Sequence, residues 1–143
     1  MEIRHMCEKD LEQVVEIEKS IFSRPWSFEA FRDSFSLEHT IYLVAVEQEK
    51  VVGYCGMYHV FNEGEIVNVA VASECRRQNV AKRLLERLFF ESVKKGVDNF
   101  FLEVRESNEP AIALYEHFGF EKAGIRKNFY ERPKENAIVM WKR

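Results

Sequence analysis

The 143-residue sequence predicts a mixed α/β fold built around one β-sheet. Three observations indicate this class. Segments with apolar residues at helical spacing alternate with β-branched and aromatic runs, one long helical segment joins two strand-like segments, and glycine and proline are sparse. A strand–helix–strand connection implies a parallel strand pair with a right-handed crossover. The length is that of one domain, so we expect residues 1–143 to fold as a unit.

The first half of the chain predicts two helices and four strands. The polar residues 48–50 predict a hairpin turn, residues 62–64 predict a second turn, and Ser27 is an expected N-cap. In order, the expected elements are a strand at 2–6, a helix at 9–22, a short helix after Ser27 with an apolar face, and strands at 40–47, 51–61 and 65–72.

The second half predicts the crossover and the end of the sheet. Gly96 is an expected helix C-cap, and Pro110 fits the first turn of a helix that Ser107 or Asn108 caps and Gly119 ends. The expected elements are a helix from about 78 to 95, a buried strand at 98–105, a helix ending at His117, and strands around 120–130 and 137–142.

Composition and charge exclude several functional classes. The net charge of −3 and the pI of about 5.9 argue against a nucleic-acid partner. No apolar run reaches the roughly 20 residues of a membrane span, and the N-terminus has no secretory signal, so we expect a cytoplasmic protein without a membrane partner. The three cysteines and four histidines show no metal-ligand spacing, so no metal is expected.

The loop at residues 76–81 is the first candidate site. It follows a strand and opens a long helix, whose first backbone N–H groups lack intrahelical partners and favour an anion. Arg76, Arg77, Lys82 and Arg83 add positive charge, so a pyrophosphate suits this loop. A solvated basic helix start explains the same pattern, and the loop alone does not decide between the two.

Two motifs carry a family resemblance. The loop resembles the acetyl-CoA loop of GCN5-related N-acetyltransferases (GNAT), written Q/R-x-x-G-x-G/A, with Arg76 first, Ala81 last, and Asn79 where the family usually has glycine. Residues 102–120 (LEVRESNEPAIALYEHFGF) closely resemble a second family segment. From about Ile3 to Met140 the chain is similar to the RimI-type ribosomal-protein-alanine N-acetyltransferases. This resemblance implies a twisted mixed sheet of about six to seven strands, about four flanking helices, and central parallel strands that splay apart.

The resemblance also implies a reaction and its residues. The acetyl group of acetyl-CoA is expected to pass, by direct attack in a ternary complex, to the N-terminal alanine of small-subunit ribosomal protein eighteen. Glu103 is the implied general base, Tyr115 the general acid toward sulfur, and Trp26 and Tyr130 the implied acceptor wall. The implied acetyl-CoA contacts are the main chain of Val69 and Val71, then Arg76, Arg77, Gln78, Asn79, Val80, Ala81, Lys82, Asn108 and Tyr115. We expect a monomer or weak dimer.

Each of these residues also has a purely structural interpretation. Glu103 suits a strand carboxylate paired with Arg105 or another cation, although burial among apolar neighbours predicts that its pKa rises toward neutrality. Tyr115 suits a core aromatic, and Asn108 suits a helix cap. Cys75, beside two arginines, admits a covalent acetyl-cysteine route, which fails if a Cys75→Ala variant keeps near-normal turnover.

Two alternative functions stay open at this stage. One is acetyl transfer to another amine, such as a lysine side chain, a polyamine or a small metabolite. The other is a weakly catalytic module that binds coenzyme A, which Asn79 in the phosphate loop favours. The acidic residue that reads the acceptor stays unassigned, with Glu135 and the neighbours of Glu103 as candidates.

Overall fold

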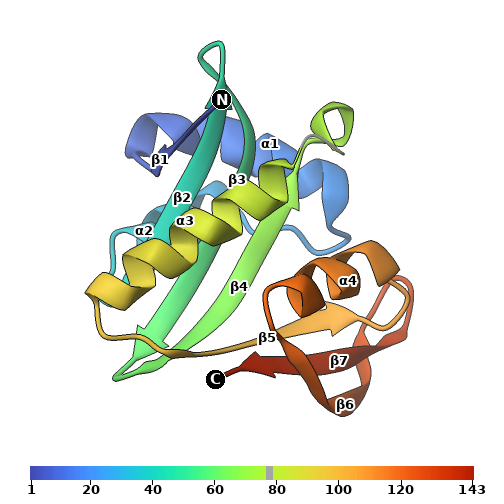
Figure 1. The fold of residues 1–143 in the computed structure, drawn as a ribbon. Coiled ribbons are helices and arrows are strands. Elements are labelled where there is room, and N and C mark those ends of the chain that lie inside the picture. Colours follow the sequence, from blue (N-terminus) through green and yellow to red (C-terminus); the bar gives the residue numbers. More distant parts are fainter. Residues whose placement is uncertain (77–78) are drawn as a thin grey trace.

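The computed structural model describes residues 1–76 and 79–143, and it has the mixed α/β architecture that the sequence predicts. Figure 1 shows its strands and helices. The strands are β1 (Glu2–His5), β2 (Thr40–Glu47), β3 (Lys50–Val60), β4 (Glu63–Val71), β5 (Asn99–Arg105), β6 (Glu121–Tyr130) and β7 (Glu135–Lys142). The helices are α1 (Leu11–Ile21), α2 (Phe28–Phe35), α3 (Val80–Lys94) and α4 (Glu109–His117), with short 3₁₀ turns at Glu8–Asp10 and Ser73–Cys75.

The seven strands form one sheet in the order β1-β2-β3-β4-β5-β7-β6. The pair β4–β5, joined through α3, is parallel, and the other neighbouring pairs are antiparallel. The crossover through α3 is the connection that the sequence predicts. In Figure 1, β5 turns away from β4 and continues with β7 and β6 as a separate wing of the sheet.

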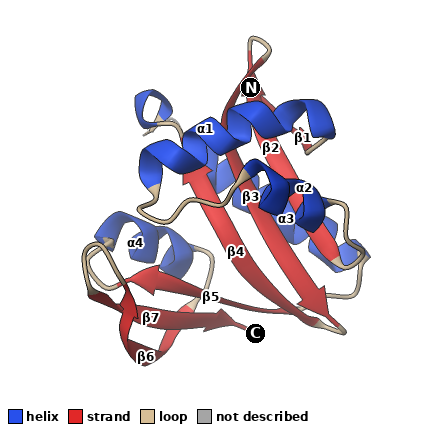
Figure 2. Cartoon of the chain, turned by 180° about the vertical axis from the view of Figure 1, so that it is seen from behind, coloured by secondary structure: helices blue, strands red, loops and turns tan. Residues whose placement is uncertain are grey.

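Helices cover both faces of β2–β4. α3 packs on one face, and α1 and α2 pack on the other, which Figure 2 shows from behind. Each helix places its apolar side toward the sheet, as its hydrophobic spacing requires. The wing of β5, β7 and β6 has α4 on the α3 side, where Leu102, Val104 and Met140 are buried with Ile112 of α4. The opposite face of this wing is more open, with Phe101 and Trp141 exposed.

Local signals mark most element ends where the sequence predicts them. Ser27 caps α2 by accepting a hydrogen bond from the N–H of Ala30, at 3.1 Å. Asn108, rather than Ser107, caps α4 by accepting one from Ala111 at 3.3 Å. The expected turn at 62–64 is displaced, because β3 ends at Val60 and residues 63 and 64 already belong to β4. Phe61 turns the chain there with a positive φ of 53°.

Candidate active site

The opening between β4 and β5 positions the whole site. Parallel pairing covers only three residue pairs and ends at Glu65 opposite Phe101. β4 then continues to Val71, paired with β3 on its other side. Over 66–71, the β4 edge that faces β5 therefore has no strand partner within the described ranges. Backbone N–H and C=O groups at such an edge require partners, and an extended ligand arm can supply them.

A bulge interrupts β4 inside this opening. Ile66 lies opposite Met57 and Asn68 opposite Gly56, so Val67 is the extra residue. A bulge redirects the backbone groups that follow it. The main chain of Val69 and Val71 lies just beyond the bulge, where the expected thioester contacts require it.

The start of α3 has the geometry of an anion site. Asn79 is its N-cap in the left-handed region, with φ 61° and ψ 22°. This is the conformation that makes glycine common in such loops, and asparagine is among the residues that tolerate it best. The free N–H groups of the first helical turn follow at Val80, Ala81 and Lys82. The expectations placed on Arg77 and Gln78 fall outside the described residues.

Glu103 points to the open face of β5, as strand alternation predicts. Its neighbours Leu102 and Val104 are buried toward α4, whereas the Glu103 side chain keeps 16% of its surface exposed. Its carboxylate accepts a hydrogen bond from Nη1 of Arg126 on β6 at 2.7 Å. The expected pairing with a cation is therefore present, and Arg126 is the partner in place of Arg105. The Arg126 side chain is 58% exposed, so the ion pair is accessible to an incoming cation.

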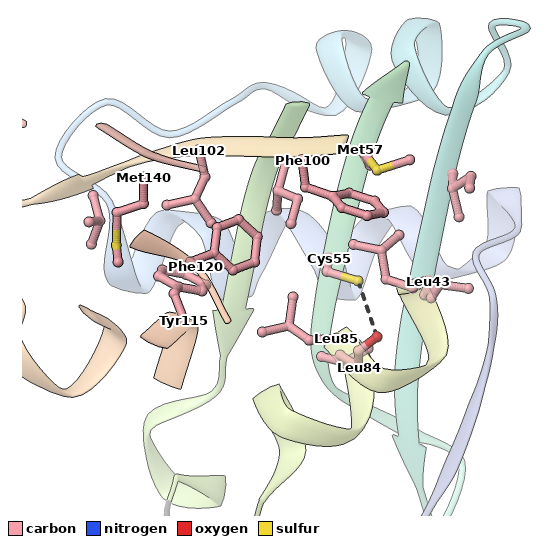
Figure 3. Packing of buried hydrophobic residues seen from close by; sticks show 14 of the residues in the cluster. Leu43, Cys55, Met57, Leu84, Leu85, Phe100, Leu102, Tyr115, Phe120 and Met140 are labelled. Carbon is pink, nitrogen blue, oxygen red and sulfur yellow. Dashed lines mark hydrogen bonds between the residues drawn. The ribbon is translucent and has the colours of Figure 1, made fainter. Parts of the chain in front are cut away.

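Tyr115 lies on the other side of the opening, in the core between α4 and the sheet. It is 8% exposed, and its ring centroid lies 5.8 Å from that of Phe120. Figure 3 shows Tyr115 and Phe120 among the buried side chains of this cluster. Burial raises the pKa of its phenol above the ordinary value, and the nearby Tyr130 and Cys55 act in the same direction. The hydroxyl is therefore a proton donor at neutral pH. The core interpretation is confirmed, and it is compatible with a role at the opening.

Tyr130, the last residue of β6, interacts electrostatically with both of these groups. Burial and the negative charge of Glu103 raise the pKa of Tyr130 to about 12. The guanidinium of Arg105 lies 4.4 Å from its ring centroid. Arg105 also donates to Oε1 of Glu135 at 3.1 Å, and the other oxygen of Glu135 accepts from the N–H of Ser107 at 2.6 Å. Glu135 thus holds the β6–β7 loop, which leaves it less available to an acceptor.

The loop that carries Trp26 meets the β6–β7 loop. Arg24 forms an ion pair with the carboxylate of Glu131, and Ser23 donates to the Glu131 carbonyl at 3.3 Å. These contacts join segments more than 100 residues apart. The loops of Trp26 and Tyr130, both expected to line the acceptor site, therefore lie side by side.

A buried carboxylate that sequence reasoning missed fixes the Trp26 loop. Glu18 of α1 is 2% exposed, and it accepts hydrogen bonds from the hydroxyl of Tyr54 and, at 2.9 Å, from the N–H of Trp26. Burial raises the pKa of Glu18, and these two hydrogen bonds oppose that rise. The Trp26 ring packs on Phe31 at 5.2 Å. A signal existed, because Glu18 interrupts the apolar face of the predicted helix.

Glu65 is the second carboxylate that sequence reasoning missed. It is the third residue of β4, and it lies where β4 and β5 separate. Burial and the charge of Glu103 raise the pKa of Glu65, whereas the charge of Arg126 works in the opposite direction. The available signal was weak, because the predicted strand 65–72 begins with Glu65, where a charged residue is ordinary.

Other chemistries find less support in the described ranges. Residues 1–76 and 79–143 hold no group of three or more His, Cys, Asp or Glu side chains placed to bind a metal ion. Within the same ranges, no helix is both long and apolar enough to cross a membrane. Burial raises the pKa of the Cys55 thiol to about 12, so this cysteine stays protonated.

The arrangement combines the parts that acyl transfer to an amine needs. It brings together an anion-binding helix start, a strand edge with free backbone groups, a carboxylate and a protonated phenol. Val69 and Val71 lie on β4 beyond the point where its pairing with β5 ends, Tyr130 interacts electrostatically with Glu103 and Tyr115, and Asn79–Lys82 lies at the start of α3. Asn108 begins α4, just after β5.

Comparisons with known proteins agree with this chemistry. The sequence model of the Acetyltransferase (GNAT) family matches residues 11–120. The [ribosomal protein bS18]-alanine N-acetyltransferase of Haemophilus influenzae is 37% identical over 134 residues, which cover 92% of this chain and 90% of the relative. The enzyme of the same name from Escherichia coli K12 is 36% identical over 133 residues, covering 92% and 89%.

Solved structures show the same fold. The crystal structure of the ribosomal-protein-S18-alanine N-acetyltransferase from Escherichia coli is similar with a TM-score of 0.91 and 34% identity, over 98% of this chain and 91% of that one. Ard1 from Thermoplasma volcanium is similar with a TM-score of 0.90 and 26% identity, over 99% and 95% of the two chains. The structural similarity thus spans nearly the whole chain, including β1–β4 and the wing of β5, β7 and β6.

Proposed function

Because the chain belongs to the Acetyltransferase (GNAT) family, we propose that it transfers the acetyl group of acetyl-CoA to the N-terminal alanine of ribosomal protein bS18. The observation that carries this proposal is the opening between β4 and β5, with Glu103 on its open face and Tyr115 behind it. Relatives named for this activity match more than nine-tenths of the chain. Residues 1–143 then act as one acetyltransferase domain in the cytoplasm, as a monomer or weak dimer.

Acetyl-CoA binding is assigned to the residues around the opening. The N–H groups of Val80, Ala81 and Lys82 hold the pyrophosphate, and Asn79 gives the loop the backbone conformation that this requires. Arg76, Arg77 and Gln78 complete the loop. The free main-chain groups of Val69 and Val71 pair with the pantetheine arm, and Asn108 adds a side-chain contact beside its capping bond. The thioester supplies the activated acetyl group.

Three groups of this chain take part in the reaction. Glu103 accepts the proton that the acceptor ammonium loses before attack, and the second proton, which the nitrogen loses as it bonds to the acetyl carbon, passes to solvent. A backbone N–H at the bulge donates to the carbonyl oxygen while negative charge develops there. Tyr115 donates its proton to the sulfur as the carbon–sulfur bond breaks. The acetyl group passes directly to the amine, so both substrates are bound at once.

Chemistry favours an α-amine as the acceptor. Its ordinary pKa of about 7.7–8.0 lies roughly 2.5 units below that of lysine, which makes deprotonation about 3.4 kcal/mol easier. A carboxylate base suffices for such an amine. Arg126 must leave Glu103 before the proton moves, and the cationic acceptor is suited to replace it. Trp26 and Tyr130 then line the path of the peptide.

The alternative of a weakly catalytic module that binds coenzyme A depended on Asn79 in the phosphate loop. The left-handed backbone of Asn79 weakens that alternative. The asparagine adopts the conformation for which the family uses glycine, so the loop shape is preserved. Other amines, such as lysine side chains and polyamines, stay as outcomes of the experiment rather than as a second proposal.

The proposal is tested by thiol release from acetyl-CoA. The acceptors are a peptide of the first residues of bS18, the same peptide acetylated at its N-terminus, and a blocked peptide that offers only a lysine. Turnover with the free α-amine alone is expected. Turnover with the lysine peptide at an equal rate would contradict the N-terminal specificity, and no turnover with any peptide would contradict the function.

The role of Glu103 is tested in the same assay. Glu103→Gln is expected to lower kcat about 10²-fold or more at pH 7, the usual contribution of a general base, and to lose less at high pH where the amine is already neutral. Glu121→Gln is the matched control, because Glu121 is an exposed acid on β6, the edge strand of the same wing of the sheet. An unchanged rate for Glu103→Gln at pH 7 would overturn the assignment.

A further inference from the structure

Glu65 lies where β4 and β5 begin to separate, which we call the vertex of the opening, and its side chain is on the open face of the sheet. It is the last residue of β4 that pairs with β5, and it lies opposite Phe101. Its neighbour Ile66 points into the core on the α3 side, so Glu65 points to the other face. Phe101 and Glu103 share that face of β5, because Phe100 and Leu102 are buried on the α3 side. Two carboxylates, from adjacent strands, therefore flank one position on the open face.

The other carboxylates of the site, Glu103, Glu135 and Glu18, each have a hydrogen-bond or ion-pair partner. Arg126 pairs with Glu103 at 2.7 Å. Glu135 is held by Arg105 and Ser107, and Glu18 by Tyr54 and Trp26. The side-chain carboxylate of Glu65, by contrast, makes no hydrogen bond or ion pair with another residue that the structure describes, although its main chain pairs within the sheet.

The electrostatic surroundings of Glu65 agree with its placement beside Glu103 on the open face. The charge of Glu103 raises its pKa and the charge of Arg126 lowers it, and partial burial adds to the rise. Arg126 pairs with Glu103 alone, so the Glu65 carboxylate is left without an ion-pair partner among the described residues. A second cation placed at this position would relieve the repulsion between Glu65 and Glu103 and would pair with the carboxylate that lacks a partner.

The acceptor itself brings such a cation. At pH 7 an α-amine with a pKa of about 7.7–8.0 is mostly an ammonium group, so it reaches the enzyme charged. An ammonium has three donors on one compact centre, and it is able to contact two carboxylates at once. One carboxylate binds the ammonium group, and the other accepts the proton that the nitrogen must lose before it attacks the thioester.

We propose that Glu65 binds the α-ammonium of the acceptor peptide at the vertex of the opening and presents it to Glu103. This inference rests on the proposed function, and it names the residue that makes a free, cationic N-terminus the preferred ligand. Glu65 is an acceptor-binding residue, and Glu103 keeps the proton-accepting role. The expected ligand class is a peptide with an unblocked terminal amine.

The test compares two ligands on the same protein. Calorimetry measures binding of the bS18 peptide and of its N-acetylated form to the enzyme saturated with coenzyme A, which cannot react. The wild type is expected to bind the free terminus about tenfold more tightly or better, the strength of one charge-assisted contact. In Glu65→Gln this ratio is expected to fall to within about twofold. The KM for the peptide rises correspondingly, whereas the KM for acetyl-CoA stays unchanged.

Two further variants separate recognition from folding. Glu63→Gln removes an exposed carboxylate two residues away on the same strand, and it is expected to keep the wild-type ratio. Glu65→Asp keeps the charge on a shorter side chain, and it is expected to retain a preference for the free terminus. Because each ratio compares two ligands on one variant, a fraction of unfolded protein lowers both affinities and leaves the ratio intact.

The outcomes are distinguishable. A Glu65→Gln enzyme that prefers the free terminus as strongly as the wild type overturns the inference and leaves the proposed function standing. A wild-type enzyme that turns over no peptide overturns the proposed function, and the inference with it. An equal change in Glu63→Gln and Glu65→Gln would show a general charge effect and would also overturn the inference.

Discussion

The departure at Asn79 from the family glycine predicts a specific pattern for its variants. Asn79 has φ 61° and ψ 22° at the N-cap of α3, and its side chain makes no capping hydrogen bond. Replacing the side chain therefore costs no hydrogen bond, and the backbone conformation decides the outcome. Alanine in the left-handed region costs about 1–2 kcal/mol. Glycine avoids that cost but loses about 0.5–1 kcal/mol through the greater freedom of the unfolded chain.

These terms predict that Asn79→Ala is about 0.5–1 kcal/mol less stable than Asn79→Gly. The same difference is expected in ligand binding, because the loop must keep this conformation to direct its N–H groups at the pyrophosphate. The KM for acetyl-CoA is expected to rise up to about fivefold in Asn79→Ala, the equivalent of 1 kcal/mol. In Asn79→Gly it is expected to equal or fall below the wild-type value, since the backbone approaches the phosphates without a side chain.

Urea denaturation gives the free energies of unfolding, and initial rates at saturating peptide give the KM for acetyl-CoA. Alanine and glycine variants of equal stability and equal KM would refute the requirement for a left-handed residue. A higher KM in Asn79→Gly than in the wild type would show instead that the amide side chain of Asn79 contributes to binding.

Three more predictions concern the chemistry and the packing. Tyr115→Phe is expected to lower kcat about 10²-fold with little change in melting temperature, because the ring keeps its contact with Phe120. Since burial raises the pKa of Tyr115 above 10, the wild-type rate is expected to show no alkaline loss below pH 10, and a fall near pH 8 would contradict the general-acid role. Gly56→Ala is expected to cost about 1–3 kcal/mol of unfolding free energy, because the new Cβ would lie 2.2 Å from the Tyr42 ring. In the control Gly124→Ala the new Cβ has nothing within 4 Å, and equal denaturation midpoints for the two variants would refute the overpacking. Cys75→Ala is expected to keep near-normal turnover, and its loss would revive the acetyl-cysteine route.

Local patterns in the sequence were sufficient for the elements and for part of the site. Hydrophobic spacing predicts α1 and α3, β-branched runs predict β2 and β3, and Ser27 and Asn108 act as the expected caps. Strand alternation alone predicts that Glu103 faces away from Leu102 and Val104. These features follow from the sequence because each depends on neighbours a few positions away.

The partners of the site residues were decided by the tertiary structure. Arg126 reaches Glu103 from another strand 23 positions later, and Glu131 meets Arg24 across 107 positions. The isolation of Glu65 depends on where the pairing of β4 and β5 stops, which no local pattern encodes. Periodicity tells which face of an element a side chain occupies. Only the packed sheet decides which charges meet on that face, because those contacts join residues that are distant in sequence.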